Sequence, residues 1–151
     1  MNNMHKLFHL GKEMKILYVE DDNALREHTK SLLNDFFSDI KVAACGQSGL
    51  ALYQEDSDGF DIVITDLNMP NMDGIAMVKK IIEIKVDQAV VVMTAHSESE
   101  YLKELIELGV ESFALKPVNL LQLITALSST AQLVSLRREN AKLKDMLRKI
   151  A

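Results

Sequence analysis

The chain has 151 residues, of which 48% are hydrophobic, and its formal net charge is −5. This length suits one domain with a buried core plus a short extension, and no apolar run approaches the roughly 18 residues of a membrane span, so we expect no membrane association. Acidic and basic residues are interspersed, which disfavours direct nucleic-acid binding by this segment; Cys45 is the only cysteine, which excludes an internal disulfide and favours a cytoplasmic location.

The N-terminal segment, MNNMHKLFHLGKEM, lacks the long apolar core and the small-residue cleavage site of a signal peptide. We interpret it as a flexible lead-in. The first strand signal follows directly, and the sequence pattern changes again near residue 132. We therefore divide the chain into a lead-in at residues 1–14, a folded domain at 15–131 and a helical extension at 132–151.

Short apolar runs rich in β-branched residues alternate with helical patterns along the folded domain. The run at residues 62–64 is continuous rather than alternating, which is typical of a strand buried on both faces of a parallel sheet. Asp22 or Asn23 can cap the first helix, and Gly109 stands where a helix commonly stops. In chain order, strands are predicted at residues 15–20, 40–44, 62–66, 89–93 and 112–115, with helices from 22 or 23, at 46–55, 73–84 and 99–108, and from 119 onward.

This order of elements predicts a doubly wound α/β fold, with one five-stranded parallel sheet and helices on both of its faces. Neither G-x-G-x-x-G nor G-x-x-x-x-G-K-[ST] occurs in the chain. A dinucleotide fold or a nucleotide P-loop is therefore not supported. Open α/β sheets bind ligands at the carboxyl ends of their strands, so the site is expected there.

Polar side chains stand where four of the five predicted strands end: Glu20 and Asp21, Asp66, Thr94, and Lys116. Because the carboxyl ends of parallel strands meet at one edge of a sheet, we expect these residues to form one site. Grouped carboxylates raise one another's pKa unless a cation intervenes, and carboxylate oxygens are ligands that Mg²⁺ prefers. An ammonium group and a hydroxyl are suited to hold a phosphoryl oxygen.

The segments KILYVEDD, DIVITDLNMPNMDG, VVVMTAH and SFALKP occur in this order. Together they resemble the receiver domain of two-component response regulators, over about residues 15–128. The resemblance implies a flavodoxin-like sheet with strand order 2-1-3-4-5. It also implies that Asp66 accepts a phosphoryl group from a histidine kinase or a phosphotransfer protein. The chain would then be a signalling domain rather than an enzyme, limited to its own phosphorylation and dephosphorylation.

The same resemblance assigns roles to the other site residues. Mg²⁺ or Mn²⁺ would be held by Asp21, Asp66 and the backbone carbonyl of Asn68, while Glu20 would act through a bound water.

Lys116 would pair with the phosphoryl group in the same scheme. Thr94 would move toward that group after phosphorylation, and Phe113 would turn inward to fill the space that Thr94 leaves. These two residues are therefore the predicted switch.

Two other functions remain open. A Mg²⁺-dependent phosphatase also forms an aspartyl phosphate, but such enzymes typically carry a second aspartate two residues after the nucleophile, where this chain has Asn68. A phosphate-independent dimerisation scaffold is the other alternative. Such a scaffold would not require Asp21, Asp66, Thr94 and Lys116 all to be present.

The last helix carries two interleaved series with a period of seven residues. Leu133, Asn140 and Leu147 fall at position a, and Leu136, Leu143 and Ile150 fall at position d. This seam predicts a coiled coil, and a polar residue at one a position favours parallel two-stranded pairing. Glu139 at g would face Lys144 at e of the partner helix. We expect a parallel homodimer, the alternative being a single helix whose leucine stripe lies on its own domain.

A receiver whose last helix continues as a parallel coil resembles the front half of longer regulators. In those proteins the coil passes the signal to an output domain. We therefore expect either that an output domain lies outside this segment or that dimerisation is itself the output. Earlier in the same helix, Leu123, Ile124 and Leu127 are expected to pack on the sheet.

Overall fold

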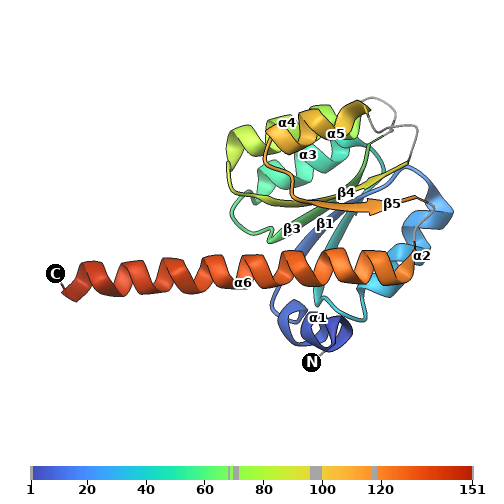
Figure 1. Ribbon diagram of the computed structural model, residues 1–151. Coiled ribbons are helices and arrows are strands. Elements are labelled where there is room, and N and C mark those ends of the chain that lie inside the picture. The colour runs from blue at the N-terminus through green and yellow to red at the C-terminus, as the bar shows by residue number, and fades with distance from the viewer. Residues whose placement is uncertain (1, 68, 70–71, 96–99, 117–118, 151) are drawn as a thin grey trace.

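Five parallel strands form one sheet in the order β2-β1-β3-β4-β5, with helices on both faces (Figure 1). The computed structural model describes residues 2–67, 69, 72–95, 100–116 and 119–150. The predicted α/β class and strand order are confirmed. The strands are β1 (Lys15–Val19), β2 (Asp39–Ala43), β3 (Ile62–Asp66), β4 (Ala89–Thr94) and β5 (Ser112–Leu115), and the helices are α1 (Asn3–Gly11), α2 (Asn23–Leu33), α3 (Gly46–Glu55), α4 (Gly74–Ile84), α5 (Leu102–Glu107) and α6 (Leu120–Ile150).

The sheet separates two hydrophobic cores. Helices α1, α2 and α6 cover one face, and α3, α4 and α5 cover the other (Figure 1). Successive side chains of a strand point to opposite faces, so Ile16 and Tyr18 join the first core while Leu17 and Val19 join the second. Because both faces are covered, every residue of β3 is buried, as its continuous apolar run predicts.

The N-terminal segment differs from the lead-in expected for residues 1–14, because Asn3–Gly11 form helix α1. The side chain of Asn2 caps this helix by accepting a hydrogen bond of 2.9 Å from the backbone N–H of His5. Leu7 is fully buried in the core that α1 shares with α6. A helix of nine residues is marginal alone. Its formation here follows from packing against residues more than a hundred positions away, which local periodicity does not reveal.

Several predicted elements differ from the structure by one residue at an end, and two differ by more than a single end residue. The second strand begins and ends one residue earlier than residues 40–44, and the helix predicted at 99–108 is shortened to α5. The first residue of that predicted helix lies outside the described part of the chain. Gly109 follows α5 with a φ of 101°, a conformation that glycine adopts without strain. The predicted helix stop at this position is therefore confirmed.

Helix α6 packs on the sheet through its first half only. Leu123, Ile124 and Leu127 are buried in the first core, as predicted, and Val134 is the last buried residue of the helix. The second half then extends beyond the globular part of the molecule (Figure 1). The long helix is present as expected, and its pairing with a second copy stays a prediction.

Candidate functional site

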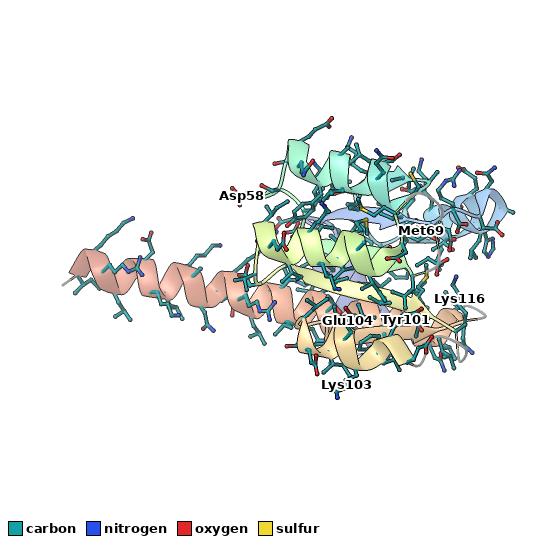
Figure 2. The ribbon with its side chains drawn as sticks, turned by 90° about the horizontal axis from the view of Figure 1, so that it is seen from above. Asp58, Met69, Tyr101, Lys103, Glu104 and Lys116 are labelled. Atoms are coloured by element: carbon teal, nitrogen blue, oxygen red, sulfur yellow. The ribbon has the colours of Figure 1, made fainter. Side chains whose placement is uncertain are left out.

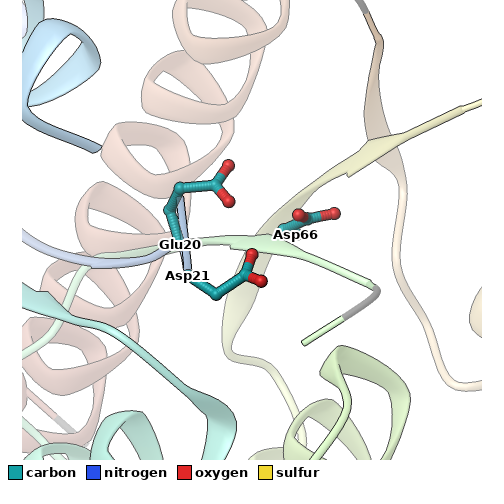
Figure 3. A group of neighbouring side chains, drawn as sticks. All are labelled: Glu20, Asp21 and Asp66. Carbon is teal, nitrogen blue, oxygen red and sulfur yellow. The ribbon is translucent and has the colours of Figure 1, made fainter. Parts of the chain in front are cut away.

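Three carboxylates meet at the carboxyl ends of β1 and β3 (Figure 3). These strands are hydrogen-bonded neighbours, so Glu20 and Asp21, which follow β1, stand beside Asp66 at the end of β3. One oxygen from each carboxylate lies within 4.8 Å of the others. Glu20 and Asp66 are 1% and 2% exposed, whereas Asp21 faces solvent. The structure thus makes one half-open acidic cluster from residues 46 positions apart in sequence.

The Asp66 carboxylate is fixed by contacts to both of its oxygens. Oδ1 accepts a hydrogen bond of 2.7 Å from the backbone N–H of Leu67, and Oδ2 lies 2.5 Å from Nζ of Lys116. Gly74 lies directly against the backbone at the end of β3, because a Cβ on Gly74 would lie 2.1 Å from the carbonyl oxygen of Asp66. This close approach explains why a glycine opens α4.

The surroundings of Glu20 disfavour its negative charge. Burial, and after it the negative charge of Asp66, raises its pKa from 4.5 to about 7. Oε2 accepts a weak hydrogen bond of 3.3 Å from the backbone N–H of Asp22. Oε1 is buried and has no hydrogen-bond partner among the described residues. A buried carboxylate oxygen without a donor is a position that a cation or its bound water would stabilise.

The donor set of the cluster fits a hard divalent cation. Carboxylates at close range repel one another, and oxygen-only ligands with room for water are the environment that Mg²⁺ prefers. Asp21 can hold the open side because its own side chain is not used as the helix cap. That role belongs to Asp22, whose Oδ1 accepts a hydrogen bond of 2.9 Å from the backbone N–H of Leu25. The predicted carbonyl ligand, Asn68, lies outside the described residues.

Thr94, the last residue of β4, and Phe113 of β5 lie beside a surface groove. The Thr94 hydroxyl donates a hydrogen bond of 3.3 Å to the carbonyl oxygen of Ala95. Phe113 is partly buried and packs against the core beneath α3, α4 and α5. Both side chains line the groove, which runs between α5 and α6. The backbone N–H of Lys116 donates a hydrogen bond of 2.8 Å to the carbonyl oxygen of Thr94. This bond joins the ends of β4 and β5.

The predicted seam of α6 is largely exposed to solvent. Four of its apolar side chains are between 57% and 80% exposed, and none of these four packs on the domain that carries it. The members of this group are Leu136, Leu143, Leu147 and Ile150. Asn140 is also exposed, while Leu133 is half-buried.

The sequence pattern does not reveal two residues that border the cluster. Arg26 donates through Nη1 to the carbonyl oxygen of Glu20 at 2.9 Å, and through Nη2 to Oδ1 of Asn23 at 2.5 Å. Tyr18 is fully buried, and burial raises its pKa, so its phenol is neutral. Because side chains two residues apart on a strand share a face, the sequence does indicate that Tyr18 lies on the same face as Glu20. The contact of Arg26 with the Glu20 carbonyl depends on tertiary geometry and has no such signal.

No described helix combines the length and the low charge that crossing a lipid bilayer requires. The family description "response regulator receiver domain" matches residues 16–128. The chain is 35% identical to chemotaxis protein CheY-3 of Vibrio cholerae over 114 residues, which are 72% of this chain and 84% of that protein.

Larger proteins contain the same domain. The chain is 30% identical over 121 residues to two-component response regulator ARR12 of Arabidopsis thaliana, and the match covers 80% of this chain but only 20% of that protein. Among solved structures, the response regulator receiver domain protein from Clostridium thermocellum superposes with a TM-score of 0.76 at 27% identity. That match covers 82% of this chain and 98% of the other.

Proposed function

The chain belongs to the response regulator receiver family, and on this premise we propose that Asp66 accepts a phosphoryl group from a histidine kinase or a phosphotransfer protein. One observation carries the proposal. A buried aspartate at a strand end is paired with Lys116 and faces two further carboxylates, Glu20 and Asp21. Accepting a phosphoryl group is general to the family. The contacts among Asp66, Lys116, Glu20 and Asp21 support a role for each of these residues in that reaction.

The carboxylate of Asp66 acts as the nucleophile in this proposal. One of its oxygens forms a bond to phosphorus as the bond between phosphorus and the donor's imidazole nitrogen breaks, and the electron pair of that bond stays with the imidazole. Lys116 would neutralise the charge that the phosphoryl oxygens bring, and its contact of 2.5 Å with Oδ2 of Asp66 supports this role. The hydrogen bond from Leu67 fixes the orientation of the attacking group.

Mg²⁺ or Mn²⁺ would supply positive charge to the phosphoryl oxygens, held by Asp21, Asp66 and the carbonyl of Asn68 and reached by Glu20 through water. The orphaned Oε1 of Glu20 and the mutual repulsion of the carboxylates support this assignment. Without a cation the carboxylates would remain crowded, and burial and Asp66 would keep the pKa of Glu20 raised.

Thr94 and Phe113 would report the phosphorylated state. Among the described residues, the Thr94 hydroxyl makes one long hydrogen bond of 3.3 Å, to Ala95, so a phosphoryl oxygen would be a better partner for it. Movement of Thr94 would change the groove that Phe113 also lines. A shift from 1% to 99% of the inward state requires a difference in affinity of about 5.5 kcal/mol.

Signal output would depend on a parallel homodimer formed by the second half of α6. Apolar side chains along the predicted seam are exposed, and pairing would remove them from water. This pair would pass the signal to an output domain or a partner protein. The chain spans only a fifth of the length of ARR12. We therefore do not assign the output activity of such larger relatives to this chain.

Mass spectrometry after incubation with Mg²⁺ and acetyl phosphate tests the proposal. We expect one labile phosphoryl group on the wild-type chain and none on Asp66→Asn. Asp58→Asn is the matched control, because Asp58 is exposed and lies on the other side of the molecule from Lys116 (Figure 2). Rapid release of phosphate from phosphomonoesters would instead indicate a phosphatase, and the absence of any adduct would indicate a scaffold.

A further inference from the structure

Two buried polar atoms near the carboxyl end of β1 have no hydrogen-bond partner among the described residues. They are the hydroxyl oxygen of Tyr18 and Oε1 of Glu20. Tyr18 is fully buried, and Glu20 is 1% exposed. Buried polar atoms in native proteins are nearly always paired, so each exception needs an explanation. Because these two exceptions lie only two residues apart, we look for one explanation that covers both.

The side chains of Tyr18 and Glu20 lie on the same face of β1. Tyr18 packs in the first core, which α1, α2 and α6 cover, and a side chain two residues later on a strand points to the same side. The backbone of Glu20 continues the pairing of β1 with β2, since its N–H donates a hydrogen bond of 3.0 Å to the carbonyl oxygen of Ala43. The phenol of Tyr18 therefore approaches the acidic cluster from the core side.

The groups that act on the Tyr18 hydroxyl locate it between α2 and the acidic cluster. Burial is the main cause that raises the pKa of the phenol, and the negative charges of Glu20 and Asp66 raise it further. Thr29 and Arg26, both on α2, act in the opposite direction. Thr29 is 2% exposed, and no hydrogen bond of normal geometry joins it to the phenol. The hydroxyl of Tyr18 thus keeps its proton and can donate it.

The backbone of Glu20 is held firmly, whereas its carboxylate is held weakly. Nη1 of Arg26 donates a hydrogen bond of 2.9 Å to the carbonyl oxygen of Glu20. On the carboxylate, Oε2 accepts a bond of 3.3 Å from the backbone N–H of Asp22, and Oε1 accepts none from the described residues. Groups behind a metal site orient its ligands through hydrogen bonds. A donor to Oε1 would supply that orientation here.

We propose that Tyr18 is a positioning residue of the cation site, and that its hydroxyl donates through a bridging water to Oε1 of Glu20. A phenol donates and a carboxylate oxygen accepts, so the two unpaired atoms are complementary. A buried water makes about three hydrogen bonds, and the hydroxyl of Thr29 can supply the third. The inference rests on the phosphoacceptor function proposed above. It adds a residue that touches neither the cation nor the phosphoryl group.

Isothermal titration calorimetry of the complete chain with Mg²⁺ tests this role. Tyr18→Phe keeps the ring and deletes the hydroxyl, and we expect its Mg²⁺ dissociation constant to rise about tenfold, as when other partners behind metal ligands are lost. Tyr53→Phe is the matched control. Tyr53 is equally buried, and its hydroxyl donates a hydrogen bond of 2.7 Å to Gln88, which precedes β4 at the opposite edge of the sheet. The dissociation constant of Tyr53→Phe should stay within twofold of the wild type.

Labelling by acetyl phosphate separates positioning from general damage to the fold. For Tyr18→Phe, the Mg²⁺ concentration that gives half of the maximal rate should rise about tenfold. The rate at saturating Mg²⁺ should stay within twofold, because Asp66 and Lys116 are unchanged. Damage to the fold would instead lower the rate at every Mg²⁺ concentration, and that result would contradict the positioning role.

A double-mutant cycle tests whether Tyr18 acts through Glu20. In a Glu20→Ala background, Tyr18→Phe should change the Mg²⁺ dissociation constant less than twofold, because the carboxylate that it orients is gone. A full tenfold loss in that background would overturn the inference. If the wild type binds Mg²⁺ and Tyr18→Phe binds it equally well, the inference is wrong and the phosphoacceptor proposal stands. A wild type that neither binds Mg²⁺ nor is labelled overturns both.

Discussion

The ammonium group of Lys116 lies 2.5 Å from Oδ2 of Asp66 and joins the end of β5 to the end of β3 across the intervening β4. The contact is asymmetric, since Asp66 is almost fully buried while the Lys116 side chain is 24% exposed. The lysine therefore shields a carboxylate that the neighbouring Glu20 destabilises. Lys116 has two separable effects, one on the stability of the fold and one on the reaction at Asp66.

Lys116→Met should slow labelling by acetyl phosphate by about tenfold or more, because the charge that offsets the phosphoryl oxygens is lost. It should also lower the free energy of unfolding by about 1–2 kcal/mol, since the buried Asp66 carboxylate loses its ion-pair partner. Time-resolved mass spectrometry and urea unfolding measure the two effects. Lys103→Met changes an exposed lysine on α5 (Figure 2) and should match the wild type in both. Unchanged labelling of Lys116→Met would contradict the assigned role.

Glu20→Gln should stabilise the metal-free protein at pH 8. The pKa of Glu20 is raised from 4.5 to about 7, so between these values the folded state binds a proton that the unfolded state has released. The contribution of Glu20 to stability is greatest below pH 4.5 and falls as pH rises to 7. Removing the charge should raise the free energy of unfolding by about 1–2 kcal/mol at pH 8.

Thermal unfolding across pH 5–8, with and without Mg²⁺, checks this expectation for Glu20. Mg²⁺ should stabilise the wild type more than Glu20→Gln, because the variant has lost one negative charge from the cluster. Glu27→Gln changes an exposed residue of α2 and should follow the wild type. Equal stability of Glu20→Gln and the wild type at pH 8 would show that solvent screens the buried charge.

The acidic cluster was predictable because topology alone brings it together. Once the strands are recognised as parallel, the ends of β1 and β3 must share an edge, so Glu20 and Asp66 become neighbours without any knowledge of side-chain packing. Contacts that depend on side-chain reach were not predictable in this way. Two examples are the hydrogen bond from Arg26 to the carbonyl oxygen of Glu20 and the ion pair between Arg138 and Asp61.

Helix α1 is the largest part of the fold that the sequence does not predict, and Leu7 is the residue that attaches it. Leu7→Ala should lower the free energy of unfolding by about 2–4 kcal/mol, because the deleted side chain is fully buried between α1 and the core. Met4→Ala changes a residue of the same helix that is 43% exposed and should have a much smaller effect. Denaturant unfolding distinguishes the two. Similar small values for both variants would mean that α1 adds little to the domain.

Asn140→Leu should increase the affinity of the homodimer and reduce its preference for the parallel two-stranded state. A polar residue at a central a position lowers the stability of a coil, because its amide is poorly satisfied between apolar layers, but it selects the parallel two-stranded state. Asn140 is exposed on α6, so the substitution leaves the receiver core untouched. Sedimentation equilibrium should give a dissociation constant at least tenfold lower, with species larger than a dimer at high concentration. Lys142→Leu, at position c, is the control for added surface hydrophobicity; an equal gain in that variant would place the seam elsewhere on the helix.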